Sequence, residues 1–220
     1  GVWVNLYGAS TLDTTLPDGN PVRLVQRTDY PWDGTVEITV ERAPQRTIAL
    51  NLRVPGWARG ASIRVNGRAA GVDTEPGTYA RLERAWSAGD RVEIDLPMRP
   101  RLLVAHPLAE EIRNQVVVAR GPLVYCLESK DLPGGIPVSD IVMPSDAVFR
   151  ESRGDGAFKG TVLLSTRALR LDVEGGPQRE LYRTLGRTTL RRQDVTLIPY
   201  FAWDNRGLSE MSTWLPVRWA

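Results

Sequence analysis

Strict alternation of apolar and polar residues is the sequence feature that most restricts how this chain can fold. In TVEITVE, Val36, Ile38 and Val40 share one side of an extended segment, and threonine and glutamate occupy the other. TIALNLRV repeats the pattern over residues 47–54, and RVEIDL repeats it over residues 91–96. Successive side chains of a strand point to opposite faces, so each segment is predicted to be a strand with one buried face.

Turn residues separate these segments. Asn66-Gly67 lies between two short extended runs, and both residues tolerate positive φ, which predicts a tight type I′ hairpin. Turn signals recur about every 8–12 residues, the spacing typical of β-sandwiches. Helical periodicity is absent apart from room for one turn after Pro107. We therefore expect an all-β chain.

Prolines interrupt the pattern in PMRPRLLVAHP, and a domain boundary is predicted there. The chain divides into residues 1–103 and residues 104–220, which we interpret as two tandem antiparallel β-sandwich modules of jelly-roll-like type. In the second module, NQVVVARGPLVYCLE reads as two strands around Gly121. LPGGIPVSDIVMPSD reads as a long connection, and residues 176–193 as a loop with one short strand.

Composition argues against several classes of partner. The net charge is +2, which gives little attraction to nucleic acid or to a membrane surface. No segment approaches the ~20 apolar residues of a membrane-spanning helix. Only Lys130 and Lys159 are lysines, and this bias towards arginine suggests a GC-rich bacterial genome. GVWVNLYGAS lacks a signal peptide and begins like a strand, so we expect a fragment of a longer protein and favour the bacterial cytoplasm.

The chain offers few groups for catalysis. Its one histidine, His106, precedes a proline near the predicted boundary and is expected to cap or pack there. Its one cysteine, Cys126, falls within a predicted strand and is expected to behave as a small buried hydrophobe. A structural zinc site needs four ligands, usually Cys or His, which these two residues cannot supply. We assign no catalytic residue and no metal ligand.

DYPWDG, at positions 29–34, is the one stretch with the chemistry of a sugar site. Two carboxylates, Asp29 and Asp33, flank two aromatic rings, and a glycosidase uses such a pair of carboxylates. The same residues also fit a wide turn pinned by a buried Trp32, because Pro31 presets φ and Asp33-Gly34 suit the last turn positions. The candidate residues for a substrate cleft or a domain interface are Asp29, Tyr30, Trp32 and Asp33.

Seven tryptophans are many for this length, and their predicted places differ. Trp57 and Trp86 end predicted strands, so we expect both to pack in or at the rim of the first module's core. The strands at residues 47–54 and 91–96 are expected to share that core, because their apolar faces have the same period.

Five stretches occur in one order across nearly all 220 positions: QRTDYPWDGTVEITV, LNLRVPGWARGASIRVNG, RAWSAGDRVEIDLPM, ARGPLVYCLE and LIPYFAWDNRG. Together they resemble the C-terminal region of glycoside hydrolase family 127, the β-L-arabinofuranosidase family. The resemblance implies β-sandwich modules that follow an upstream (α/α)6 helical barrel. In that family the barrel carries a cysteine nucleophile, a zinc ion held by cysteines and a glutamate, and a separate glutamate as acid/base.

None of the family's catalytic or zinc-binding positions falls in this chain. Cys126 matches a core position of the GPLVYCLE strand, not the paired-cysteine motif of the family's site. The resemblance therefore implies a non-catalytic region that is inactive alone. Its expected partner is the barrel of the same polypeptide, and zinc is expected only in that barrel. DYPWDG is then expected to be a rigid turn that faces the barrel. Carbohydrate is a second expected partner of the chain.

Two other functions stay open beside the accessory region. A free-standing carbohydrate-binding module would bind sugar alone, whereas an accessory region would present an apolar patch to its partner. A purely structural or assembly domain would not contact the cleft at all. The strand-like start of the chain favours the accessory region.

The ligand count gives a first prediction. After dialysis, the purified chain is expected to hold no stoichiometric zinc, because one Cys and one His leave too few soft ligands. Elemental analysis of the dialysed protein measures this. A ratio near one metal per chain would overturn both the prediction and the assignment of Cys126 to the core.

Overall fold

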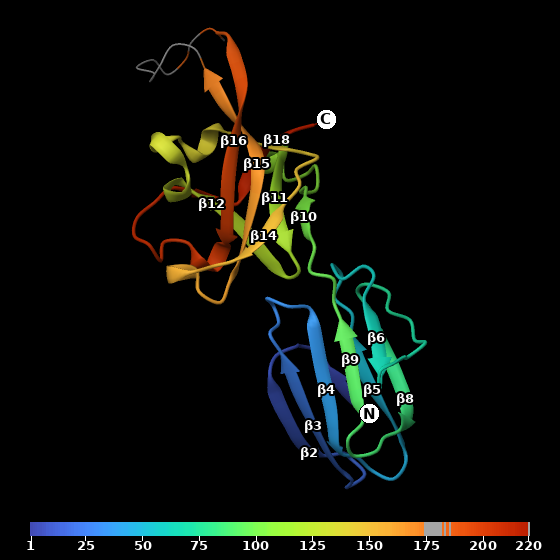
Figure 1. The fold of residues 1–220 in the computed structure, drawn as a ribbon. Coiled ribbons are helices and arrows are strands. Elements are labelled where there is room, and N and C mark those ends of the chain that lie inside the picture. Colours follow the sequence, from blue (N-terminus) through green and yellow to red (C-terminus); the bar gives the residue numbers. More distant parts are fainter. Residues whose placement is uncertain (174–181, 183, 185, 220) are drawn as a thin grey trace. The chain divides into compact units, whose positions relative to one another are not determined.

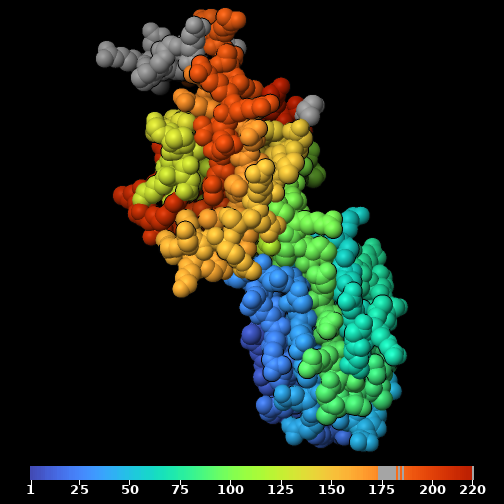
Figure 2. All heavy atoms as spheres, in the orientation of Figure 1, coloured from blue at the N-terminus to red at the C-terminus, as the bar shows by residue number. Residues whose placement is uncertain are grey.

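The computed structural model describes residues 1–173, 182, 184 and 186–219. The fold is all-β, as predicted, and every helix among the described residues is a 3-10 turn of three residues. The chain forms two compact units, Gly1–Arg99 and Pro100–Ala220 (Figure 1 and Figure 2). Each unit has its own sheets and is described separately below.

The first unit is a sandwich of two sheets. One sheet has the strand order β1-β5-β8, and the other has the order β2-β3-β4-β9-β6-β7. The strands of the first sheet are β1 (Val2–Val4), β5 (Thr47–Arg53) and β8 (Tyr79–Ala85). Those of the second are β2 (Ser10–Thr15), β3 (Pro21–Thr28), β4 (Thr35–Arg42), β9 (Arg91–Asp95), β6 (Ser62–Val65) and β7 (Arg68–Ala69).

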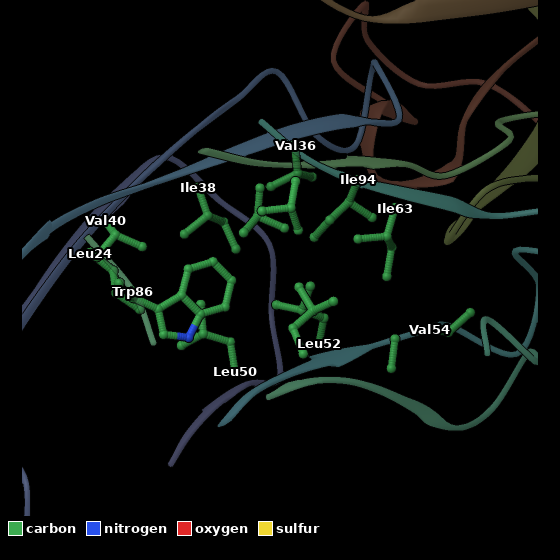
Figure 3. Packing of buried hydrophobic residues seen from close by; sticks show 14 of the residues in the cluster. Leu24, Val36, Ile38, Val40, Leu50, Leu52, Val54, Ile63, Trp86 and Ile94 are labelled. Carbon is green, nitrogen blue, oxygen red and sulfur yellow. The ribbon is translucent and has the colours of Figure 1, made fainter. Parts of the chain in front are cut away.

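The predicted alternation builds the core between these sheets. Val36, Ile38 and Val40 of β4 are buried, and in Figure 3 they lie opposite Leu50 and Leu52 of β5. Burial of a large aliphatic side chain contributes about 1.5–3 kcal/mol, so these facing rows hold the two sheets together.

Both tryptophans assigned to this core lie in or beside it. Trp86 is buried and donates its indole N–H to the carbonyl of Ile48 at 3.1 Å. This bond satisfies the one polar atom that the ring takes out of water. Trp57 is half-buried and packs against the same apolar cluster.

The predicted hairpin at Asn66-Gly67 is confirmed. The two residues have φ values of 52° and 77°, and Val65 pairs with Arg68 across the turn. The Asn66 side chain donates to Asp90 at 2.8 Å and accepts from the backbone N–H of Arg91 at 2.8 Å. These bonds tie the hairpin to the turn before β9.

In the second unit one sheet closes on itself. β11 pairs with both β18 and β12, which joins the two ends of the path β18-β13-β15-β16-β12 into a ring (Figure 1). The ring strands are β11 (Gln115–Arg120), β12 (Leu123–Glu128), β13 (Ile141–Pro144), β15 (Val162–Val173), β16 (Thr188–Pro199) and β18 (Trp214–Arg218). The other strands are β10 (Pro100–Leu103), β14 (Arg150–Arg153) and β17 (Met211–Ser212).

The two strands expected around Gly121 are β11 and β12, and the turn after Pro107 is the 3-10 turn η1 (Glu110–Ile112). The division between the units precedes Pro100 instead of following residue 103, because β10 pairs with β11. Two pairings are parallel where only antiparallel ones were expected: β1 with β5, and β13 with β18.

Two segments expected as a connection or as mostly loop contain longer strand pairing. β13 occupies part of the Pro- and Gly-rich stretch and pairs with β15 and β18. β16 starts at Thr188, inside residues 176–193, where a loop with one short strand was expected, and it pairs with β15 as far as Val173. Within this segment, residues 176–181, 183 and 185 lie outside the described residues. In the part of the chain that the structure describes, no helix has the length and apolar character to cross a bilayer.

Truncation of a core side chain tests this packing. Leu52 is 0% exposed, so Leu52→Ala is expected to lower the free energy of unfolding by about 2–5 kcal/mol. Leu6→Ala is the matched control: Leu6 is 78% exposed, and its loss should change stability by no more than about 0.5 kcal/mol. Urea unfolding followed by tryptophan fluorescence measures both. Equal effects of the two substitutions would contradict the assigned core.

Candidate functional site

DYPWDG forms the loop between β3 and β4, which are paired from Thr28 and Val36 onward. The carbonyl of Asp29 accepts hydrogen bonds from the backbone N–H groups of Trp32, at 2.8 Å, and Asp33, at 3.3 Å. The peptide bond between Tyr30 and the proline that follows it is cis. The two hydrogen bonds to the Asp29 carbonyl close the backbone of the loop into a turn.

Side chains at the two ends of the loop complete this closure. The Asp33 carboxylate accepts from the backbone N–H of Thr35 at 2.7 Å. The Thr28 hydroxyl accepts from the backbone N–H of Tyr30 at 3.0 Å and donates to the Thr35 carbonyl at 2.6 Å. Local bonds of this kind compete with strand pairing and end it, which explains why the ladder stops here.

Tyr30 is half-buried and turned towards the core of the first unit. Its ring meets that of Tyr7 edge-on, with centroids 6.1 Å apart, and the Tyr7 hydroxyl donates to the Arg53 carbonyl at 2.6 Å. Burial raises the pKa values of both phenols, Tyr7 more than Tyr30. Both hydroxyls therefore stay protonated at neutral pH, and neither can serve as a base there.

Gly34 fixes the loop to the end of β9. Its carbonyl accepts from the backbone N–H of Leu96 at 3.0 Å, and it is buried. A Cβ at this position would lie 1.8 Å from the Leu96 carbonyl oxygen, so only glycine allows the two backbones to approach this closely.

The structure thus brings the four candidate residues together in one loop with different roles. Asp29 and Asp33 are exposed, and Tyr30 and Trp32 are half-buried. The Asp33 carboxylate holds the loop backbone, and Tyr30 anchors the loop to the core. Asp29 and part of Trp32 are accessible to solvent.

His106 and Cys126 occupy the structural places expected of them. His106 is exposed, and its Nδ1 accepts from the backbone N–H of Leu108 at 3.3 Å, which caps a local turn. Cys126 is fully buried in β12 beside Phe158 and Ile198. Burial, with the nearby carboxylates of Glu128 and Asp131, raises the pKa of the Cys126 thiol to about 12. The reactive thiolate is therefore negligible at neutral pH.

Within residues 1–173, 182, 184 and 186–219, no three His, Cys, Asp or Glu side chains lie close enough together to share a metal ion.

A buried ion-pair cluster in the second unit was missed at the sequence level. Glu128 is 0% exposed and pairs with Arg206, which also binds the Asp131 carboxylate at 2.7 and 2.9 Å. The Ser209 hydroxyl donates to Glu128 at 2.6 Å, and the backbone N–H of Asp204 donates to it at 3.3 Å. Burial alone raises the pKa of Glu128, but the bonds from Ser209 and Arg206 outweigh it and lower the pKa below its usual range.

The distance between the partners along the sequence explains why this cluster could not be predicted. Glu128 and Arg206 are separated by 78 positions, and nothing in their local sequence marks them as partners. The signal that could have found them is the unusual location of Glu128 at the end of an otherwise apolar strand, LVYCLE. A buried carboxylate requires a cation and hydrogen-bond donors.

Each of the two units matches a domain model of the same protein family. Residues 1–98 match the family model of the "Beta-L-arabinofuranosidase, GH127 middle domain", and residues 100–216 match that of the "Glycoside hydrolase family 127 C-terminal domain". The chain belongs to glycoside hydrolase family 127. The two matched regions meet where the structure separates the two units.

Individual family 127 relatives agree with this membership. The chain is 34% identical over 201 residues to the non-reducing end beta-L-arabinofuranosidase of Bifidobacterium longum subsp. longum, covering 84% of this chain and 29% of that enzyme. A solved structure titled "Glycoside hydrolase" matches with a TM-score of 0.91 at 42% identity, over 99% of this chain and 36% of the other.

Two solved family members extend the comparison. The GH127 beta-L-arabinofuranosidase Ara127N from Geobacillus stearothermophilus T6 gives a TM-score of 0.88 at 35% identity, covering 98% of this chain and 33% of that one. The beta-arabinofuranosidase BT3674 gives 0.85 at 30% identity, with coverages of 98% and 34%. The chain thus spans about a third of these relatives.

Gly34 provides the test of the loop geometry. Gly34→Ala is expected to lower the free energy of unfolding by about 1–3 kcal/mol, because the new methyl group overlaps the Leu96 carbonyl and β9 must shift. Gly8→Ala serves as the control, since nothing lies within 4 Å of a Cβ there. Chemical denaturation compares the two variants. An unchanged stability of Gly34→Ala would show that the loop is not held against β9.

Proposed function

We propose that this chain is the non-catalytic accessory region of a β-L-arabinofuranosidase-like glycoside hydrolase. In this proposal it packs on a helical catalytic barrel of the same polypeptide, which holds the zinc ion and performs the hydrolysis. The observation that carries the proposal is the match to the middle and C-terminal domains of family 127, which together make up only about a third of the relatives.

The chemistry of the described residues supports an accessory role. The Cys126 thiol is buried and protonated, and the His106 ring nitrogen caps a turn on the surface. Of the two loop carboxylates, the one on Asp33 is committed to the backbone of its own loop. We therefore assign these groups to structure and expect the chain alone to be inactive.

The β3–β4 loop is assigned to the interface with the barrel. It is closed by its own hydrogen bonds and fixed to β9 through Gly34, so it can present Asp29 and Trp32 without ordering on contact. A preorganised aromatic group suits an interface, because little conformational entropy is lost on docking. In this role the loop shapes one wall of the cleft and takes no part in bond cleavage.

A chimera tests the accessory role. The matching region of the Bifidobacterium longum arabinofuranosidase is replaced by this chain, and hydrolysis of a chromogenic β-L-arabinofuranoside is measured. We expect the chimera to be active, and the truncated enzyme and this chain alone to be inactive. Full activity of the truncated enzyme would contradict the proposal, as would turnover by the chain alone that is lost on mutating one of its own residues.

Trp32→Ala separates an interface role from a core role. The substitution is expected to reduce the hydrolysis rate or the melting temperature of the active chimera, because the contact with the barrel is lost. In the chain alone, where Trp32 is only half-buried, the change in melting temperature should be small. Loss of several kcal/mol in the chain alone would make Trp32 ordinary core, and no effect in either protein would remove the loop from the interface.

A further inference from the structure

The segment after β16 exposes three aromatic side chains within four positions. The 3-10 turn η6 (Tyr200–Ala202) leads into Trp203. Tyr200 is 47% exposed, Phe201 61% and Trp203 39%, whereas Ala202 is 3% exposed and packs beside Cys126 in the apolar cluster. The turn is thus anchored by its alanine and leaves its rings outside.

The 3-10 turn brings the backbones of two of these aromatic residues close together. The backbone N–H of Trp203 donates to the Tyr200 carbonyl at 3.1 Å, which closes the turn. Residues three apart in such a turn lie above one another, separated by a rise of ~6 Å. The closed turn therefore keeps the Cα atoms of Tyr200 and Trp203 within about 7 Å of each other, roughly the width of a sugar ring.

The buried ion-pair cluster holds this segment in place. Arg206 binds Glu128 and Asp131, and its backbone carbonyl accepts a hydrogen bond from Lys130. The guanidinium also lies over the ring of Phe158, 4.6 Å from its centroid. Glu128 further accepts from Asp204, the residue directly after Trp203. The buried Glu128 carboxylate, bonded to Arg206 and to the Asp204 backbone, therefore holds the loop that carries the rings.

We propose that Tyr200 and Trp203 form a carbohydrate-binding platform on the second unit, for arabinose-containing oligosaccharides. The choice of sugar rests on the proposed function. The negative faces of aromatic rings attract the slightly positive C–H groups of a sugar ring. The exposed side chains of Asp204 and Asn205 follow directly and supply acceptors and donors for hydroxyl groups.

The polar neighbours of Trp203 suit a sugar ligand, because exposed carboxylate and amide groups can form hydrogen bonds with its hydroxyl groups. Next to Trp203, Asp204 is exposed and has a φ of 65°, a conformation that Asp adopts more readily than most residues. Rigid rings beside exposed carboxylate and amide groups suit a ligand that is rich in hydroxyl groups.

Binding by the 220-residue chain tests the platform. Short β-L-arabinofuranosyl oligosaccharides are titrated while tryptophan fluorescence and two-dimensional amide NMR spectra are recorded. We expect saturable binding, with amide shifts centred on residues 200–205. Tyr200→Ala and Trp203→Ala should each weaken the affinity about tenfold, the loss expected when an anchoring aromatic side chain is removed.

The control is Trp219→Ala, which removes another exposed tryptophan, 59% accessible, outside the platform and should leave the affinity unchanged. Melting temperatures of all variants, measured in parallel, show whether each one folds. The proposal is overturned if the wild-type chain binds none of these sugars, or if both platform variants bind as the wild type does.

A further outcome would identify a protein-docking surface instead. Platform variants could lower the activity of the chimera while the wild-type chain shows no affinity for sugar. That result would reject the carbohydrate platform and leave the accessory role intact. Conversely, sugar binding by the chain together with an inactive chimera would reject the accessory role alone.

Discussion

The first unit depends on one constraint: each strand must bury one face and leave the other in water. The rows of Val36, Ile38 and Val40 on one sheet and Leu50 and Leu52 on the other satisfy it by facing each other. Because side chains alternate along a strand, a slip of one residue would turn the whole row to the solvent. The register that results fixes where the strands end, and so where the loops begin.

Both candidate surfaces are loops made rigid by bonds to a sheet. The β3–β4 loop is closed by Thr28 and Asp33 and held against β9 at Gly34. The segment after β16 is held by Arg206 and the buried carboxylate of Glu128. The means differ, since the first uses hydrogen bonds of Thr28, of Asp33 and of the Gly34 backbone, and the second uses an ion pair to the buried Glu128. In both cases these bonds hold the backbone that carries the aromatic rings, so the proposed contacts would cost less conformational entropy.

The strands and turns with a local signal could be predicted, and the rest could not. The Asn66-Gly67 hairpin needs two residues with positive φ, and the sequence supplies both. β13 lies in a stretch rich in proline and glycine, yet it is a strand because β15 and β18 flank it. For the candidate site, the turn could be predicted from Pro31 and Asp33, but the packing of Tyr30 on Tyr7 depends on a distant residue.

The sequence by itself determined which residues face the core and where tight turns occur. Each of these follows from side-chain chemistry or from backbone preferences within a few residues. Only the tertiary structure decided that the sheet of the second unit closes through β11 and β12, and that Glu128 meets Arg206. Such pairings use backbone groups that every residue carries, or charges 78 positions apart. Their partners are therefore chosen by the packing of the whole unit.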